Sequence, residues 1–302
     1  MPEEAPLSPD NQEEILPDPL YMPDGSRIKT PDAWSNRARP LLKQIVEMEY
    51  GGLPPEPASV LVESLCHSHA KTLPGQPRHF MYRIRCLGGH QPVSFTVRIL
   101  LPESRDPLPA ILNGDGCWTY ATEAVITRIL EEGFAFIQFN RTELAEDLGY
   151  HDVPDKFKQT GGLYDAYPDG QFGAVSAWAW GYHRVIDALQ EWPFIDSRRV
   201  AVTGHSRGGK TSLLAGATDP RIALVNENAS GACGSAPFRH IGPGGETLDI
   251  LNQFPSWFGK GLRPYIGRET EIPFDQNGLL ATVCPRPLLS TYSLDDHWSN
   301  PE

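Results

Sequence analysis

Cysteine, positive charge and long apolar runs are all scarce in this chain of 302 residues. The five cysteines are scattered and form no C-x-x-C pair, which argues against a zinc ribbon or a disulfide framework. No run of 18 or more apolar residues occurs, so no membrane-spanning helix is expected. The 26 Lys and Arg residues against 38 Asp and Glu leave a net charge of -12, which disfavours binding to nucleic acid through its phosphates.

The first twenty residues also lack a cationic segment followed by an apolar stretch, so we expect no export signal in the chain as given. This absence leaves the compartment unknown. What the chain does contain is typical of a globular protein, with 40% hydrophobic and 21% charged residues. Its 28 Gly and 29 Pro predict many turns and a surface rich in loops.

Two regions are predicted, an N-terminal arm with a helix at residues 1–50 and one α/β domain at residues 51–302. The arm is rich in Pro, Asp and Glu, and we expect it to lie on the domain surface. Residues 34–50 carry apolar side chains at helical spacing, which predicts a helix that Pro40 interrupts early.

The domain begins with predicted strands and continues with alternating strands and helices. Residues 79–87 are expected to form the first strand, and residues 93–99 alternate between apolar and polar side chains, as in a half-buried strand. Beyond residue 108, short apolar runs alternate with helical stretches, the longest at residues 173–191. This pattern predicts a mostly parallel sheet with helices on both faces, a three-layer sandwich. The apolar runs are residues 109–112, 134–139, 200–203, 222–225 and 287–291.

The most specific motif is Gly204-His205-Ser206-Arg207-Gly208, which fits G-x-S-x-G. A buried strand is predicted before it, at residues 199–203, and a helix after it, at residues 210–217. A strand, a sharp turn and a helix are the context that a nucleophilic serine elbow requires. The two glycines would relieve crowding at the turn, and the start of the helix would stabilise an oxyanion.

The sequence around this motif resembles the glucuronoyl esterases, carbohydrate esterase family fifteen, especially their bacterial members. The resemblance implies an α/β-hydrolase fold and hydrolysis of esters between the 4-O-methyl-glucuronic acid of xylan and lignin alcohols. It implies a polysaccharide substrate, no metal or other cofactor, and a protein that is usually secreted or periplasmic; we expect a monomer. The stretches that carry the resemblance are residues 16–40, 177–190, 196–225, 253–258, 272–289 and 295–302.

The resemblance assigns roles to three residues of the elbow. Ser206 corresponds to the family nucleophile, and Arg207 to an arginine that helps stabilise the oxyanion, for which a guanidinium is a strong charge-assisted donor. Lys210 corresponds to a lysine that contacts sugar hydroxyls. A cation in the first turn of a helix opposes the helix dipole, which favours a functional role for this lysine over a solvent-facing one.

The acidic residue of the triad has three candidates. Many family members carry a glutamate where this chain has Ala229, and Glu227 is two residues away from that position. Other bacterial members place the acid after a later strand, where the alignment gives Asp296 as the acid and Asp295 as the fallback. The alternative is that both aspartates merely cap a loop.

Two further residues correspond to sugar-binding positions of the family. Trp298 corresponds to a tryptophan that packs on the sugar, although it could equally be part of the core. Glu246 lies near a polar residue that binds the glucuronate hydroxyls. Residues 113–116 follow a strand where α/β-hydrolases place a second oxyanion loop, in which backbone N–H groups rather than side chains would act. Trp178 and Trp180 are expected to pack in the core.

None of the nine histidines takes the position of the family base, which lies in a loop well beyond the acid. We therefore expect the chain given to be part of a longer protein. Two alternatives stay open: an esterase for acetylated xylan or another carbohydrate, and a non-catalytic carbohydrate-binding relic. The cations Arg207 and Lys210 beside the serine favour an acidic sugar, because a deacetylase would not need them.

Overall fold

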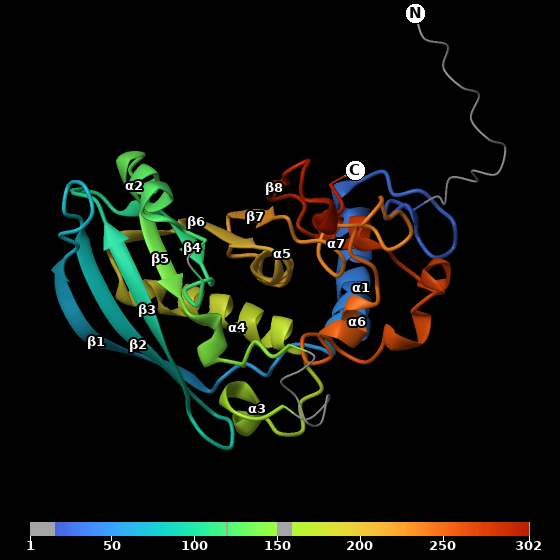
Figure 1. Ribbon diagram of the computed structural model, residues 1–302, viewed down its shortest axis with the longest axis horizontal. Helices are drawn as coiled ribbons and strands as arrows, with labels where there is room; N and C mark the ends of the chain where they lie inside the picture. Colours follow the sequence, from blue (N-terminus) through green and yellow to red (C-terminus); the bar gives the residue numbers. More distant parts are fainter. Residues whose placement is uncertain (1–15, 119, 150–158, 302) are drawn as a thin grey trace, which may run out of the picture.

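The computed structural model describes residues 16–118, 120–149 and 159–301. Its centre is a mixed sheet in which eight described strands follow the order β1-β2-β3-β5-β4-β6-β7-β8 (Figure 1). Residues 1–15 of the predicted arm and His151 lie outside the described residues. The strands are β1 Ser59–His69, β2 Arg78–Leu87, β3 Val93–Leu101, β4 Leu108–Asn113, β5 Ala135–Phe139, β6 Ile195–His205, β7 Leu224–Asn228 and β8 Leu288–Thr291.

The sheet has an antiparallel half and a parallel half. Strands β1, β2, β3 and β5 pair antiparallel in that order, and β5, β4, β6, β7 and β8 pair parallel. The predicted strands are confirmed, with β7 beginning two residues later than expected. The expectation that residues 79–87 form the first strand is wrong, because β1 precedes them. The side chains of β1 are mostly exposed, so the strand shows no apolar alternation.

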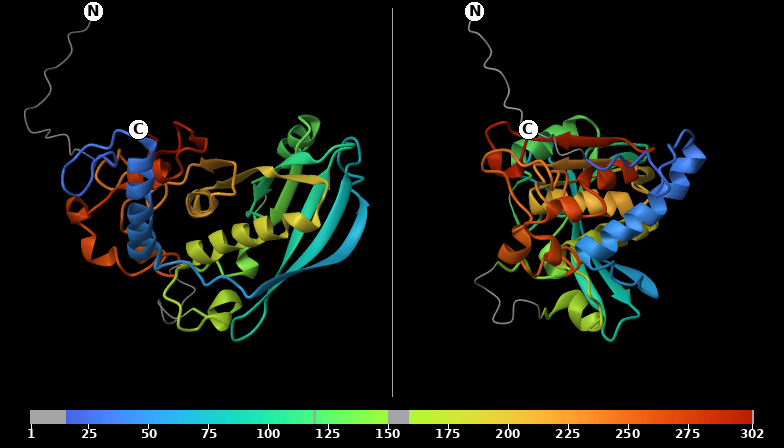
Figure 2. Two further views of the ribbon diagram at one scale, coloured as in Figure 1. Left: turned by 180° about the vertical axis from the view of Figure 1, so that it is seen from behind. Right: turned by 90° about the vertical axis from the view of Figure 1, so that its right-hand side faces the viewer.

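Helices cover the sheet on both faces, as predicted (Figures 1 and 2). The long helix α4 packs against α5 and the antiparallel strands on one face. On the opposite face α2 covers Leu100 and Phe136 with its buried Ile126 and Leu130. The helices are α1 Pro31–Tyr50, α2 Glu123–Glu131, α3 Gly162–Ala166, α4 Ala174–Ala188, α5 Arg207–Thr218, α6 Ile250–Gln253 and α7 Gln276–Thr282.

The core between the sheet and α4 is built from large aromatic side chains. Trp178 and Trp180 of α4 are both almost fully buried, which confirms that they pack in the core. Their indole N–H groups donate to the carbonyls of Ala145 and Pro55, at 2.8 and 2.9 Å. These bonds tie α4 to the loop after β5 and to the segment before β1.

The N-terminal helix α1 packs on α7 and beside the C-terminal segments (Figure 2). It runs unbroken through Pro40, contrary to the predicted interruption. A proline removes one helical hydrogen bond, and here the burial of Leu41 and Ile45 against the core outweighs that loss. At the end of the helix, the Tyr50 hydroxyl donates to the carbonyl of Cys233 at 2.9 Å. Among the described helices, none is both long and apolar enough to span a membrane.

The parallel half of the sheet positions the site. The carboxyl ends of β4, β6, β7 and β8 meet at one edge, because parallel strands share their direction. In open α/β sheets, ligands bind in the crevice outside these ends. The loops that follow these four strands begin at Gly114, Ser206, Ala229 and Tyr292.

Candidate active site

Ser206 occupies a sharp turn between β6 and α5, as the motif predicts. Its backbone has φ 55° and ψ -120°, a conformation that costs free energy in a residue other than glycine and that clusters at functional sites. The N–H of Ser206 donates to the carbonyl of Asn228 at 2.9 Å, which fixes the turn against β7. A Cβ atom on Gly204 would collide with the Gly208 carbonyl, and one on Gly208 with the Asp115 carboxylate. The two glycines are therefore required for the turn to close.

The loop after β4 lies where a second oxyanion loop was predicted, but its backbone N–H groups already have acceptors. The N–H groups of Gly114 and Asp115 donate to the Tyr182 hydroxyl at 2.7 Å and to Asn113 Oδ1 at 3.0 Å. The N–H of Gly116 donates to the Phe139 carbonyl at 3.0 Å. Residues 114–116 therefore offer no free N–H group, whereas the first residues of α5 have no intrahelical acceptor and can supply donors for an oxyanion.

The side chain of Asp115 is a correction to the expectation that only backbone groups matter in this loop. Asp115 is fully buried, and its Oδ2 accepts the backbone N–H of His205 at 2.9 Å. Its Oδ1 pairs with the guanidinium of Arg141. Burial raises the pKa of the Asp115 carboxyl, while Arg141 opposes that change. Asp115 thus fixes the residue that directly precedes Ser206.

Arg207 projects from the first position of α5 and is held by aromatic rings and a carboxylate. Its Nη1 donates to both oxygens of Asp147, at 3.0 and 3.2 Å. The guanidinium carbon lies 4.4 Å from the centre of the Trp257 ring and 5.5 Å from that of Trp118. About a quarter of the side chain remains exposed. A cation held in this way beside Ser206 can donate to a developing oxyanion.

Lys210 and Glu246, predicted on different grounds, form a buried pair. Lys210 Nζ lies 2.7 Å from Glu246 Oε2, and the two side chains are 2% and 5% exposed. The ammonium also donates to the carbonyls of Ser230 and Ala232, the latter at 2.6 Å. The sequence alone did not indicate that these residues touch.

Trp298 is 49% exposed, so the reading that places it in the core is excluded. The carbonyl of Trp298 accepts the backbone N–H of Glu246 at 2.9 Å. This bond joins the segment after β8, which carries Trp298, to the loop that carries Glu246. An exposed indole next to a buried ion pair is suited to packing on the apolar face of a sugar ring.

The candidate acids lie in different environments. Glu227 is fully buried in β7, where its Oε1 accepts from the Tyr292 hydroxyl at 3.2 Å. Ala229 follows β7 with φ 48°, and its N–H donates to the Thr291 carbonyl at 2.8 Å. Asp296 is half-buried and precedes the short turn His297–Ser299, and Asp295 is exposed. Asp296 thus lies outside the core, beyond the end of β8.

The described histidines form no hydrogen bond with the candidate nucleophile. The ring of His205 hydrogen-bonds through Nδ1 to Asn228 Oδ1 and contacts Tyr120 edge-on, with ring centres 4.5 Å apart. His183 lies in α4, and burial lowers its pKa. In the described part of the chain, no hydrogen bond joins a histidine to Ser206. Nor is any group of three or more His, Cys, Asp or Glu arranged there to hold a metal ion.

The residues that sequence analysis missed are those that hold Arg207. Asp147 and Arg141 follow β5, and Trp257 lies just after α6. Trp257 lies in one of the stretches that carry the family resemblance, but nothing in the sequence links any of the three to Arg207, because they come from parts of the chain 50 to 66 positions away from it. The available signal was the run of charged residues directly after the apolar strand β5.

Known proteins resemble this chain over almost its full length. The family described as "Glucuronyl esterase, fungi" matches residues 84–302. A 4-O-methyl-glucuronoyl methylesterase of Podospora anserina is 31% identical, with 94% of this chain aligned, and the chain spans 56% of that relative's length.

Solved structures share the fold. A promiscuous CE15 esterase from a marine bacterial metagenome superposes with a TM-score of 0.77 at 27% identity, covering 95% of this chain and 81% of the other. A mutant glucuronoyl esterase from Sporotrichum thermophile was solved with methyl 4-O-methyl-β-D-glucopyranuronate. It superposes with a TM-score of 0.76 at 28% identity, covering 95% and 73%. The sheet order, the serine elbow and these similarities lead to one conclusion: the chain belongs to the glucuronoyl esterase family and has the α/β-hydrolase fold.

Proposed function

We propose that the protein is a serine carboxylester hydrolase that cleaves 4-O-methyl-glucuronoyl esters of the kind that link xylan to lignin alcohols. The observation that carries the proposal is the strained turn at Ser206, followed by two cations, Arg207 and Lys210, in the first turn of α5. Membership in the glucuronoyl esterase family and the glucuronate ester bound by the Sporotrichum relative support it.

The chemistry begins with attack of Ser206 Oγ on the ester carbonyl. The hydroxyl proton passes to a histidine base, a position that no described histidine occupies, and the carbonyl oxygen becomes an oxyanion. Arg207 donates to this oxyanion together with N–H groups at the start of α5. Because the N–H groups of residues 114–116 have acceptors within the protein, the guanidinium carries a large share of the stabilisation. Collapse releases the alcohol, and water then hydrolyses the acyl-enzyme.

We assign Asp296 as the carboxylate that orients the histidine. Glu227 is fully buried, with Oε1 accepting from Tyr292, and it lies within β7 rather than in a loop beyond the sheet. Asp296 follows β8 at the carboxyl edge of the sheet, where α/β-hydrolases place this residue.

We assign the sugar site to Lys210, Glu246 and Trp298. The three donors of the Lys210 ammonium are taken by Glu246 and two backbone carbonyls, so Lys210 acts by holding Glu246, and the exposed indole packs on the ring. All of these residues come from one chain, which is consistent with a monomer that binds glucuronoxylan or a lignin–carbohydrate ester. Such a substrate belongs to the plant cell wall, so the proposal implies an exported enzyme.

The test compares benzyl glucuronate with an aryl acetate, using the full-length protein and its Ser206→Ala variant. We expect kcat/KM to be at least tenfold higher for the glucuronate ester, because only that substrate engages the sugar site. Ser206→Ala should leave less than about a hundredth of the activity, with an unchanged melting temperature. A preference for the acetate would favour the deacetylase alternative. Turnover by the alanine variant close to the normal rate would exclude the serine mechanism.

A further inference from the structure

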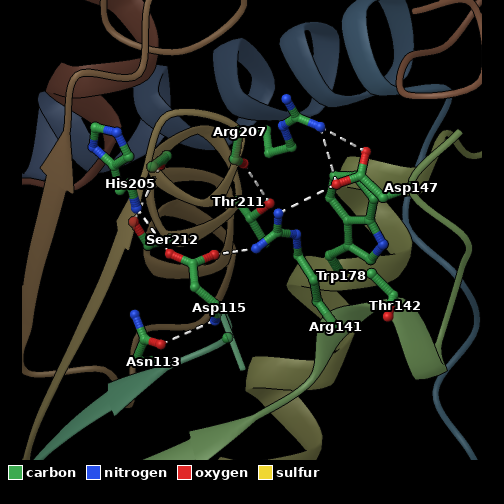
Figure 3. Close-up of polar contacts among 12 residues, drawn as sticks. Asn113, Asp115, Arg141, Thr142, Asp147, Trp178, His205, Arg207, Thr211 and Ser212 are labelled. Atoms are coloured by element: carbon green, nitrogen blue, oxygen red, sulfur yellow. Dashed lines mark hydrogen bonds and ion pairs between the residues drawn. The ribbon is translucent and has the colours of Figure 1, made fainter. Parts of the chain in front are cut away.

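Four side chains of alternating charge form a continuous row beneath the serine elbow (Figure 3). Arg141 lies between two carboxylates, pairing with Asp115 on one side and with Asp147, at 3.4 Å, on the other. Asp147 in turn pairs with Arg207 at 3.0 Å. Arg141 and Asp115 are almost completely buried, and Asp147 is 7% exposed.

Asp147 is held at three points. Arg141 donates to its Oδ2, and the indole N–H of Trp257 donates to its Oδ1 at 3.1 Å. Arg207 donates to both oxygens through one nitrogen, Nη1. Because two of these three donors come from parts of the chain other than the elbow, the position of Asp147 does not depend on Arg207.

This arrangement fixes one end of the Arg207 guanidinium and leaves the other for the substrate. In the described residues, the side-chain hydrogen bonds of Arg207 all run through Nη1. The ring of Trp257 covers one side of the group, with the guanidinium carbon 4.4 Å from the ring centre. These contacts reduce the rotamer freedom of the arginine side chain before the substrate arrives. Donors that are fixed in advance contribute most to transition-state stabilisation.

The opposite end of the row reaches the backbone of the elbow. Asp115 accepts the N–H of His205, the residue directly before Ser206. Arg141, whose guanidinium lies 4.9 Å from the centre of the Trp178 ring, links this carboxylate to Asp147. Arg141 thus sets the distance between Asp115, which holds the residue before Ser206, and Asp147, which holds Arg207.

We propose that Asp147, held by Arg141 and Trp257, is the positioning residue that fixes Arg207 for oxyanion stabilisation. The proposal rests on the proposed function, in that it assigns Arg207 to the oxyanion. Asp147 acts through Arg207 and does not touch the substrate. Its loss should therefore lower kcat, leave KM almost unchanged, and have no effect on kcat once Arg207 is gone.

The test is a double-mutant cycle with Asp147→Asn and Arg207→Ala, assayed on benzyl glucuronate. Removal of an oxyanion donor costs about 10²- to 10³-fold in kcat, so misplacement of that donor by Asp147→Asn should cost about tenfold. In the Arg207→Ala background, the same change should alter kcat less than twofold. An equal loss in both backgrounds would overturn the proposal, because Asp147 would then act independently of Arg207.

A matched control separates this role from stability. Asp275, the residue before α7, pairs with Arg239 at 3.0 Å, and the two side chains are 0% and 7% exposed. Asp275→Asn should lower the melting temperature as much as Asp147→Asn does, with kcat within twofold of the unaltered protein. If Asp275→Asn lowered kcat as strongly, the effect of Asp147→Asn would reflect a general loss of structure, and the proposal would fail.

A second readout does not depend on the substrate. In nitrogen-15 NMR spectra, the guanidinium of Arg207, assigned through Arg207→Ala, should show restricted rotation that Asp147→Asn abolishes. An unchanged Arg207 signal in Asp147→Asn would contradict the positioning role even if the protein proved inactive on glucuronate esters. If the unaltered protein were inactive and Asp147→Asn still abolished the restricted rotation of Arg207, the proposed function would be refuted but the positioning role of Asp147 would stand.

Discussion

Lys210 and Glu246 lie 2.7 Å apart in an almost fully buried ion pair, although 36 positions separate them in the chain. The pair joins the elbow helix α5 to the loop that is attached to Trp298. Since a lone buried charge is costly, each of the two residues depends on the other. A test of either residue in sugar binding must therefore separate the loss of stability from the loss of substrate contacts.

Lys210→Met is expected to raise KM for benzyl glucuronate at least tenfold and to leave aryl acetate hydrolysis almost unchanged. It also leaves the Glu246 carboxylate buried without a partner, so the free energy of unfolding should fall by about 3–5 kcal/mol. The double variant Lys210→Met/Glu246→Gln removes both charges and should recover much of that stability without recovering KM. If the double variant restored KM as well, or if both substrates suffered equally, the pair would have only a structural role.

Arg207→Ala is expected to lower kcat for the glucuronate ester by about 10²- to 10³-fold while KM changes less than threefold. The reason is that the guanidinium acts on the oxyanion, which exists only in the transition state and the intermediate. Steady-state kinetics over a range of substrate concentrations separate the two parameters. A large rise in KM at constant kcat would show that Arg207 instead binds the ground state.

Asp296→Asn is expected to lower kcat by about 10⁴-fold, as loss of the orienting carboxylate does in serine hydrolases. Glu227→Gln should leave kcat within about threefold, because Glu227 bonds to Tyr292 inside the core. Both variants are assayed for kcat in the active enzyme, with Asp295→Asn as the exposed neighbouring control. If Glu227→Gln were the more damaging change, the assignment of the acid would move to β7.

Glu49→Gln is expected to stabilise the protein at alkaline pH. Glu49 is fully buried near the end of α1, and burial raises its pKa from 4.5 to about 7. The native state therefore holds a proton that the unfolded chain has lost, and this contribution to stability is complete below pH 4.5 and declines as the pH rises through about 7.

At pH 8 the glutamine variant should have a free energy of unfolding about 1–2 kcal/mol higher than the unaltered protein, and a melting temperature about 2–8 °C higher. Near pH 4 the two proteins should be equally stable. Its amide oxygen can still accept the bond that Gln276 donates to Glu49 at 2.8 Å. Thermal melts across this pH range measure the difference. Glu47→Gln, an exposed site in the same helix, serves as the control and should show no such trend.

The parallel half of the sheet could be predicted from the sequence because its strands are continuous apolar runs. Strand β1 could not, since its side chains are mostly exposed and it is an edge strand that pairs only with β2. The effect of Pro40 was overestimated because the packing of α1 on the core is not visible in a local pattern.

The same distinction between local and distant contacts applies to the site. Ser206, Arg207 and Lys210 lie within five consecutive positions, so a motif could indicate all three. Asp147 and Trp257 meet Arg207 only after the loops following β5 and α6 are brought together. Likewise, the chain shows Lys210 and Glu246 as separate candidates, and only the folded protein makes them a pair.

The hydrogen bond from Tyr50 to the Cys233 carbonyl connects the N-terminal helix to the proposed sugar site. Cys233 lies directly after Ala232, whose carbonyl binds Lys210, so α1 supports the wall behind that lysine. Removal of the first fifty residues would therefore take away the contact of Tyr50 that supports the loop around Lys210. A shortened protein of this kind should retain more hydrolysis of small esters than of glucuronate esters.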